Sequence, residues 1–231
     1  MIPVITIDGP SGAGKGAITH RLAEYLGFNI LDSGALYRLI GLSARQNNVP
    51  FDAEERLARL ARDMKVDFLP TGDPQEPLKV LLEDRDVTLK IRSDQAGSDA
   101  SHVAPLKLVR GAIRDLQRDF MKEPGLVADG RDMGTIVFSD ALVKIYLTAS
   151  AEARAQRRYK QLKDKDIGVS LHALFQSIQE RDDRDMNRKV APLIPAQDAH
   201  VIDSTDIGID DVFRQVLTIV KEVIVEKKVE N

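Results

Sequence analysis

The segment Val4-Ile-Thr-Ile-Asp-Gly-Pro-Ser-Gly-Ala-Gly-Lys-Gly16 lies near the start of the 231-residue chain. Its first residues are mostly apolar and β-branched, which predicts a buried strand. After the glycine-rich stretch, Ile18, Leu22 and Leu26 recur on one face of a predicted helix, and Gly27 stands where a C-cap is expected. A strand, a glycine-rich turn and a helix in this order are typical of a phosphate-binding loop in an α/β protein.

The glycine-rich loop has the composition and spacing needed to hold phosphate groups. Glycines let backbone N–H groups turn toward phosphate oxygens, and the N-terminus of the following helix adds partial positive charge. Lys15 is placed to reach the β- and γ-phosphates of a nucleotide. The alternative, a tight turn that needs glycine for steric reasons alone, does not account for a lysine at this spacing. The predicted ATP-binding residues of the loop are Gly9, Pro10, Ser11, Gly12, Ala13, Gly14, Lys15, Gly16 and Ala17.

The two residues after Lys15 narrow the class of nucleotide-binding protein. GTPases and motor ATPases usually carry Ser or Thr directly after this lysine as a Mg²⁺ ligand, whereas Gly16 and Ala17 supply no side-chain oxygen. The pattern is closer to the Lys-Gly-Thr variant of nucleoside-monophosphate kinases, where phosphates and water hold most of the metal. Ala17 departs from that variant too, because it lacks the threonine hydroxyl. We therefore predict Mg²⁺ bound with ATP and no direct side-chain ligand.

Short apolar, β-rich segments alternate with helical patterns along the chain. We predict strands at Val4–Asp8, 28–31, 126–129, 143–147 and His200–Asp203. Strands separated by helices predict a five-stranded parallel sheet flanked by helices, with ligands beyond the carboxyl ends of the strands.

Two regions interrupt this alternation. Residues 66–69 and 78–82, on either side of the turn-rich stretch 70–74, predict a small antiparallel β insertion. Residues 160–188 are densely charged and nearly free of aliphatic core residues, which predicts an exposed, mobile flap over the site.

Two polar motifs follow predicted strands, at the sheet edge where ligands are expected. Ser33 begins a helix, where it can cap the helix and donate to an anion, and Arg38 can reach the same phosphate bidentately. Asp129 ends a strand and can orient metal-bound water, while the glycines beside Arg131 and Asp132 let both side chains turn into the cleft. A capped helix with a surface arginine, and a turn held by its own aspartates, are the alternative interpretations.

A third polar motif lies in the flap. Arg181, Arg184 and Arg188 recur at i, i+3 and i+7, which predicts three guanidiniums on one helical face. Taken alone, such a charge run is more typical of a solvated lattice of ion pairs. A flap over ATP has a use for these cations, because phosphoryl transfer develops negative charge that fixed cations stabilise.

The composition is that of an ordinary globular protein, with 43% hydrophobic and 30% charged residues. The net charge of −3 gives no electrostatic reason to expect nucleic acid or an anionic membrane as a partner. The absence of cysteine excludes disulfides, thiolate metal sites and cysteine nucleophiles. We find neither a leader pattern nor a run of about 20 apolar residues, so we expect a cytoplasmic protein. No heptad pattern or apolar stripe is left over for a partner, which favours a monomer.

Taken together and in this order, the motifs resemble those of bacterial-type cytidylate kinases. The stretches that carry the resemblance are Gly9-Pro-Ser-Gly-Ala-Gly-Lys-Gly16, Leu31-Asp-Ser-Gly-Ala-Leu-Tyr-Arg38, Ala128-Asp-Gly-Arg-Asp-Met-Gly134 and Glu180-Arg-Asp-Asp-Arg-Asp185. The resemblance runs from Pro3 to about Ser204. It implies one kinase domain over residues 1–231, with a core of about 1–40, 105–157 and 189–231, a monophosphate-binding insertion of about 41–104 and a helical lid of about 158–188.

The resemblance also implies an activity and roles for single residues. ATP would donate its γ-phosphoryl group to CMP or dCMP, and Ser101, Arg110 and Asp132 would read the cytosine. Ser33, Arg38, Arg131 and Arg188 would hold the monophosphate, Asp185 would accept a ribose hydroxyl, and the flap arginines would meet ATP. The implied CMP-binding residues are Ser33, Arg38, Ser101, Arg110, Arg131, Asp132, Arg181, Asp185 and Arg188. Arg157 and Arg158 are further implied ATP-binding residues, and the expected catalytic residues are Lys15, Asp129, Arg131 and Arg188.

The expected reaction needs no general base, because a phosphate monoester with a second pKa of about 6 is already ionised at neutral pH. The nearest alternative is a kinase of the same architecture that acts on UMP, AMP or shikimate, and the base-reading residues discriminate against it. A nucleotide switch with an effector partner is the alternative of another class, which Gly16 and Ala17 disfavour.

Overall fold

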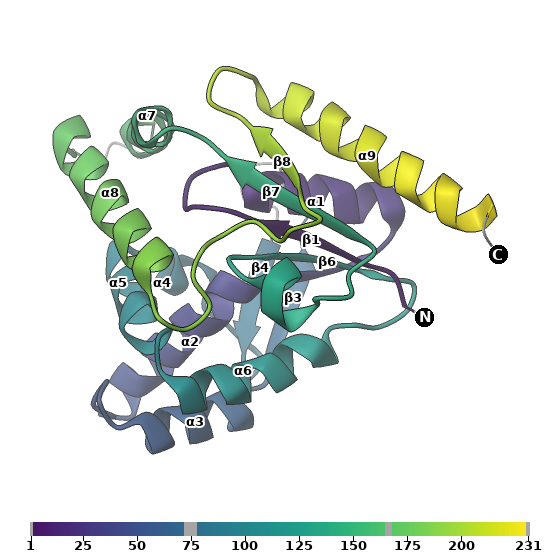
Figure 1. The fold of residues 1–231 in the computed structure, drawn as a ribbon. Helices are drawn as coiled ribbons and strands as arrows, with labels where there is room; N and C mark the ends of the chain where they lie inside the picture. Colours follow the sequence, from purple (N-terminus) through teal and green to yellow (C-terminus); the bar gives the residue numbers. More distant parts are fainter. Residues whose placement is uncertain (1, 72–77, 165–167, 230–231) are drawn as a thin grey trace.

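The computed structural model describes residues 2–71, 78–164 and 168–229 (Figure 1). Its central sheet contains five parallel strands in the order β2-β6-β1-β7-β8. These strands are β1 (Val4–Asp8), β2 (Asn29–Asp32), β6 (Leu126–Gly130), β7 (Val143–Thr148) and β8 (His200–Asp203). All five predicted strands are confirmed to within one residue at each end, because short apolar runs between helices are typical of a sheet buried on both faces.

Helices cover both faces of this sheet and create two separate cores. On one face, Ile5 and Ile7 of β1 pack in a cluster with residues of α1 (Lys15–Leu26) and α9 (Ile209–Val229). On the other face, α2 (Ser33–Gln46) and α6 (Lys107–Asp119) pack against residues of β2 and β6. The predicted first helix is confirmed, including its left-handed C-cap at Gly27.

The predicted insertion is present and contains more helices and strands than the two strands predicted for it. It contains α3 (Glu54–Asp63), β3 (Val66–Pro70), β4 (Leu78–Leu82), β5 (Arg85–Asp86), α4 (Thr88–Ile91) and α5 (Asp94–Val103). Strands β3, β4 and β5 form an antiparallel sheet of their own. Strand β5 was not predicted, since two charged residues carry no pattern of alternation. The turn expected at 70–74 lies partly outside the described residues.

The described part of the predicted flap, residues 160–188, contains the end of α7 (Ala151–Lys163) and all of α8 (Leu171–Asn187). The two helices lie together at one side of the sheet (Figure 1). No side chain of α8 is buried, as the charged composition led us to expect. The prediction of three arginines on one helical face is wrong in detail. Helix α8 ends at Asn187, so Arg188 lies in extended backbone beyond it, and the Arg184 side chain is exposed.

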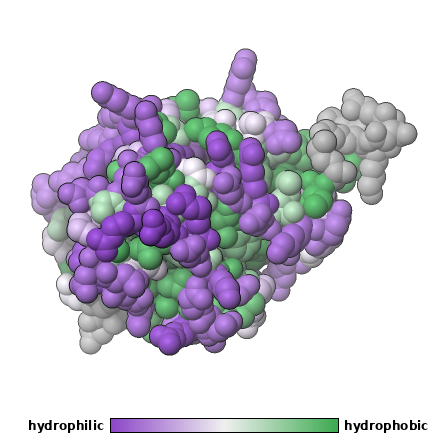
Figure 2. Space-filling model, turned by 90° about the horizontal axis from the view of Figure 1, so that it is seen from below, coloured by the Kyte–Doolittle hydropathy of each residue, from purple (hydrophilic) through white to green (hydrophobic). Residues whose placement is uncertain are grey.

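The surface is mostly polar on the face seen in Figure 2, where hydrophobic residues show only in small patches between hydrophilic ones. None of the described helices is long and apolar enough to cross a membrane.

Candidate active site

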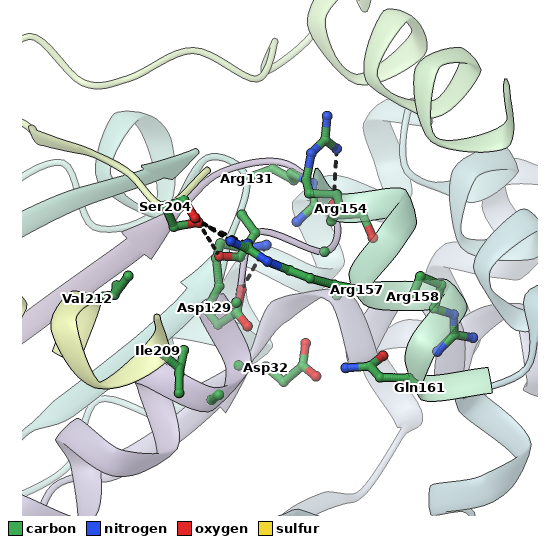
Figure 3. A pocket seen from close by; sticks show the side chains of 18 of the residues that line it. Asp32, Asp129, Arg131, Arg154, Arg157, Arg158, Gln161, Ser204, Ile209 and Val212 are labelled. Carbon is green, nitrogen blue, oxygen red and sulfur yellow. Dashed lines mark hydrogen bonds and ion pairs between the residues drawn. The ribbon is translucent and has the colours of Figure 1, made fainter. Parts of the chain in front are cut away.

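A cavity of about 560 Å³ lies where the phosphate loop, the start of α2, the end of β6 and helix α7 meet (Figure 3). Its lining has far more positive than negative charge. The cationic side chains are Lys15, Arg38, Arg131, Arg154, Arg157, Arg158 and Arg181, and the carboxylates are Asp32 and Asp129. A concave site with this charge is suited to a polyanionic ligand.

The loop between β1 and α1 owes its shape to glycines. Gly9 and Gly14 have φ values of 147° and 97°, a range that other residues rarely adopt. A Cβ added to Gly9 would lie 1.9 Å from the Leu147 carbonyl oxygen, so β7 itself requires glycine there. The residues predicted from the sequence to bind phosphate therefore form a tight loop, which opens on the cavity from Ser11 to Ala17.

Lys15 folds back onto this loop. Its Nζ donates to the Pro10 carbonyl oxygen at 3.0 Å and lies 3.7 Å from Asp129 Oδ1. Burial and, to a lesser extent, the positive charge of Arg131 lower the pKa of Lys15 to about 8, although the carboxylate of Asp129 acts in the opposite direction. Lys15 is thus a buried cation in a positive site, an arrangement that phosphate oxygens would stabilise.

Asp129 is the carboxylate closest to Lys15, as its place at the end of β6 predicts. Burial and the negative charge of Asp32 raise the pKa of Asp129 to about 6, although the positive charge of Lys15 acts in the opposite direction. Within the described part of the chain, no three His, Cys, Asp or Glu side chains gather as a metal site. Asp129 and Asp32 are the acidic residues of the cavity, and their carboxylates can accept hydrogen bonds from metal-bound water.

Three arginines present buried N–H groups for which no hydrogen-bond partner exists among the described residues: Arg38 Nε, Arg181 Nε and Arg188 Nη2. Other nitrogens of the first two are anchored, Arg38 Nη1 on the Ile91 carbonyl oxygen at 3.3 Å and Arg181 Nη1 on Ser11 Oγ at 3.4 Å. Burial lowers the pKa of Arg181 to about 10, and Arg131 and Arg38 add repulsion. Buried N–H groups are costly unless an acceptor pairs with them, so this arrangement is suited to binding an anion.

A second group of predicted residues lies beside the cavity. Arg110 and Asp132 form a buried ion pair, and the Arg110 guanidinium lies 6.0 Å from the ring centroid of Tyr37. Burial lowers the pKa of Arg188, whereas the carboxylates of Asp132 and Asp185 oppose that shift. Arg131 Nε donates to Asp185 Oδ2 at 3.0 Å, which links the turn after β6 to α8.

Two predicted serines differ from expectation. Asp32, not Ser33, caps α2, because the Asp32 carboxylate accepts from the Ala35 N–H at 2.9 Å. The Ser33 hydroxyl is buried and accepts from Gln117 Nε2 at 2.8 Å. The Ser101 hydroxyl donates to the Gly97 carbonyl oxygen of its own helix at 3.1 Å and does not line the main cavity.

Helix α7 supplies cavity residues, only some of which were predicted. Arg154, which was missed, is buried and donates to the Ser11 carbonyl oxygen and to Asp182, each at 3.0 Å. Arg157 extends toward Ser204 and donates to its hydroxyl at 3.1 Å (Figure 3). Arg158 lies farther along the cavity wall. One arginine in a helix rich in arginine carries no signal in the sequence that it is buried.

Comparison with known proteins agrees with this geometry. The cytidylate kinase family model matches residues 5–222. The cytidylate kinase of Shewanella amazonensis is 57% identical over 213 residues, which cover 92% of this chain and 92% of that protein. The cytidylate kinases of Shewanella frigidimarina and Shewanella pealeana are 56% and 55% identical, with coverage of 93% and 94% of each chain. With this match and a phosphate loop that opens on an arginine-lined cavity, the chain belongs to the cytidylate kinase family.

Proposed function

We infer that the protein transfers the γ-phosphoryl group of ATP to CMP or dCMP and releases ADP and CDP or dCDP. The observation that carries this function is the set of buried N–H groups of Arg38, Arg181 and Arg188, for which the described residues supply no acceptor. One phosphate chain on the loop would leave arginines on the far side of the cavity unsatisfied, whereas a second phosphate-bearing substrate supplies acceptors for them.

We propose that ATP lies with its phosphates on residues 9–17. The backbone N–H groups would hold the phosphates, and Lys15 would leave the Pro10 carbonyl oxygen to contact the β- and γ-phosphates. Arg157 and Arg158 line the same cavity from α7 and are assigned to the ATP side. The lid of about residues 158–188 would cover this side and exclude water, which would otherwise consume ATP by hydrolysis.

The acceptor nucleotide is assigned to the other side, between the core and the insertion of about residues 41–104. Arg38, Arg131 and Arg188 would hold its phosphate, and Asp185 would accept a ribose hydroxyl. The buried pair of Arg110 and Asp132 would read the base, with Asp132 accepting from the cytosine amine and Arg110 donating to N3 and O2. Ser33 and Ser101 keep their assignments to this side, and each would have to exchange its present hydrogen bond for one to the nucleotide.

The chemistry then consists of positioning and charge stabilisation. The acceptor phosphate is the nucleophile and is already mostly ionised at neutral pH, so no side chain has to remove a proton. Lys15, Arg131 and Arg188 would stabilise the negative charge spread over the transferred group. A Mg²⁺ ion bound with ATP would neutralise phosphate charge, and Asp129, which lines the cavity, would orient its water ligands.

A coupled assay of ADP release with Mg-ATP tests the function, with CMP, dCMP, UMP and AMP compared side by side. We expect strong turnover with CMP and dCMP and little with UMP or AMP. A Lys15→Ala variant that stays folded should lose most of this activity. ADP release at the same slow rate with and without any acceptor would contradict the proposal and favour a nucleotide switch.

A further inference from the structure

One buried carboxylate that is assigned to neither substrate contacts the turn after β6, which we call the base-reading turn. We propose that Asp8, at the end of β1, is a positioning residue that fixes the turn of residues 130–134 and thereby directs Arg131 and Asp132 toward the acceptor nucleotide. The proposal rests on the function inferred above, because it concerns how that function's acceptor side is built.

The hydrogen bonds of Asp8 go to the backbone of this turn. Asp8 Oδ1 accepts from the Met133 N–H at 2.9 Å, and Oδ2 accepts from the Gly134 N–H at 2.7 Å. Met133 and Gly134 are the first two residues of the π-helical turn η1 (Met133–Val137), so their N–H groups have no acceptor within that turn. Asp8 therefore acts as a helix cap contributed by a different strand.

The turn also packs against β1 without room for a side chain. A Cβ added to Gly134 would lie 2.8 Å from Thr6 Oγ1 and 3.3 Å from Asp8 Oδ2. The backbone of Gly134 can approach the carboxylate this closely only because the residue is glycine. Close packing and two hydrogen bonds together hold the turn in one position relative to Asp8. Because Asp8 directly precedes Gly9, they also fix the turn relative to the phosphate loop.

The two functional residues of the turn have other, exchangeable partners. Asp132 is paired with Arg110, and Arg131 is paired with Asp185. A bound nucleotide would compete for both pairs, whereas the Asp8 hydrogen bonds go to the backbone of the turn, and Asp8 is only 4% exposed. Asp8 thus holds the turn in place while Arg131 and Asp132 change partners.

Burying the Asp8 carboxylate also costs free energy, and the fold does not need a charged side chain at this position for its stability. Burial raises the pKa of Asp8 to about 7 even though the hydrogen bonds from the Gly134 and Met133 N–H groups act in the opposite direction. A buried carboxylate satisfied by two backbone N–H groups is a local exception to apolar core packing, and such exceptions concentrate at functional sites.

Steady-state kinetics of an Asp8→Asn variant test this role, with Thr6→Val as the matched control. Asn has the size of Asp but turns an N–H₂ donor toward one of the two N–H donors, so one hydrogen bond is lost and the turn is displaced. Thr6 lies on the same face of β1, and no partner for its buried hydroxyl exists among the described residues. We expect Asp8→Asn to raise the KM for CMP about tenfold or more and to reduce the preference for CMP over UMP. Its KM for ATP should change less than about twofold, and Thr6→Val should leave all three quantities at wild-type values.

Several results would overturn the proposal. An unchanged KM for CMP in folded Asp8→Asn, or an equal rise of both KM values, would show that Asp8 serves only folding. If Asp8→Asn does not fold, Gly134→Ala tests the same turn, and it should give the same split between the KM for CMP and the KM for ATP. Wild-type enzyme that is inactive with CMP in this assay would instead refute the proposed function itself.

Discussion

At the scale of single residues, Lys15 has the most informative environment. Its ammonium group is buried, and its pKa is lowered to about 8 by burial and by Arg131. Bound phosphate would favour the charged form and raise this pKa, so ATP binding near pH 8 should take up about half a proton. Calorimetric titration with ATP in two buffers of different ionisation enthalpy measures this uptake directly. A folded Lys15→Met variant should lose the uptake, and equal heats for the wild type in both buffers would contradict it.

Single residues also show where prediction from the sequence ends. The loop, Asp129 and Arg131 were predicted because their spacing after strands carries the information. Asp8 and Arg154 were not, since their partners Gly134 and Ser11 lie 126 and 143 residues away. A lone buried charge leaves no periodic signal in a sequence, and only the fold brings it to its partner.

At the scale of elements, a polar link joins α8 to the phosphate loop. None of its side chains is buried, and Asp182 joins it to Arg154, which in turn donates to the loop carbonyl oxygen of Ser11. An Asp182→Asn variant should weaken this link, because the amide lacks the charge that pairs with Arg154. Hydrogen exchange in α8 should then become faster, and the KM for ATP should rise severalfold. The exposed neighbour Asp183 provides the control, since Asp183→Asn should leave exchange and KM unchanged; equal effects of the two variants would refute the link.

The elements themselves were predictable to different degrees. All five parallel strands were predicted, because each is a short apolar run between helical patterns. The inner strands β1, β6 and β7 are mostly buried, whereas only Ile202 of the edge strand β8 is buried. Strand β5 and the end of α8 were not, because charged surface segments obey no hydrophobic period. The base-reading turn was predictable only in part. Its residues can be recognised in the sequence, but its π-helical geometry in η1 involves Asp8 from another strand.

At the scale of the whole molecule, Asp8 makes stability depend on pH. Its pKa is about 7 in the folded protein and near 3.8 in the unfolded chain. Between these values the unfolded chain releases a proton that the folded protein keeps, so raising the pH favours unfolding, by at most about 1.4 kcal/mol per pH unit. Below pH 3.8 and above about pH 7 the contribution is flat.

Urea unfolding of the wild type and Asp8→Asn between about pH 4.5 and 8 tests this dependence. The variant lacks the titrating group, so its free energy of unfolding should improve relative to the wild type as the pH rises toward 7. Parallel pH curves for the two proteins would contradict the account, and Thr6→Val should follow the wild type throughout.

The molecule as a whole explains why the class of function was easier to predict than the detailed site. The strand order and the phosphate loop follow from local patterns, whereas the cavity combines the loop, α2, β6, α7 and α8. A role for the arginines can be inferred only once the fold brings these elements together. Within the described residues, nitrogens of Arg38, Arg181 and Arg188 are then seen to be buried and without a partner.

The central claim is that a single cleft joins ATP to a nucleotide whose base is read by Asp132. The most direct measurement is the ratio of kcat/KM for CMP to kcat/KM for UMP, in the wild type and in Asp132→Asn. We expect a wild-type ratio of about 10 to 100 or more, because the Asp132 side chain would present a hydrogen-bond acceptor to the uracil carbonyl, which is also an acceptor. The amide introduced by Asp132→Asn can donate to that carbonyl, so the ratio should fall toward one in the variant. A wild-type ratio near one, or the same high ratio in both proteins, would contradict the claim that Asp132 reads the base.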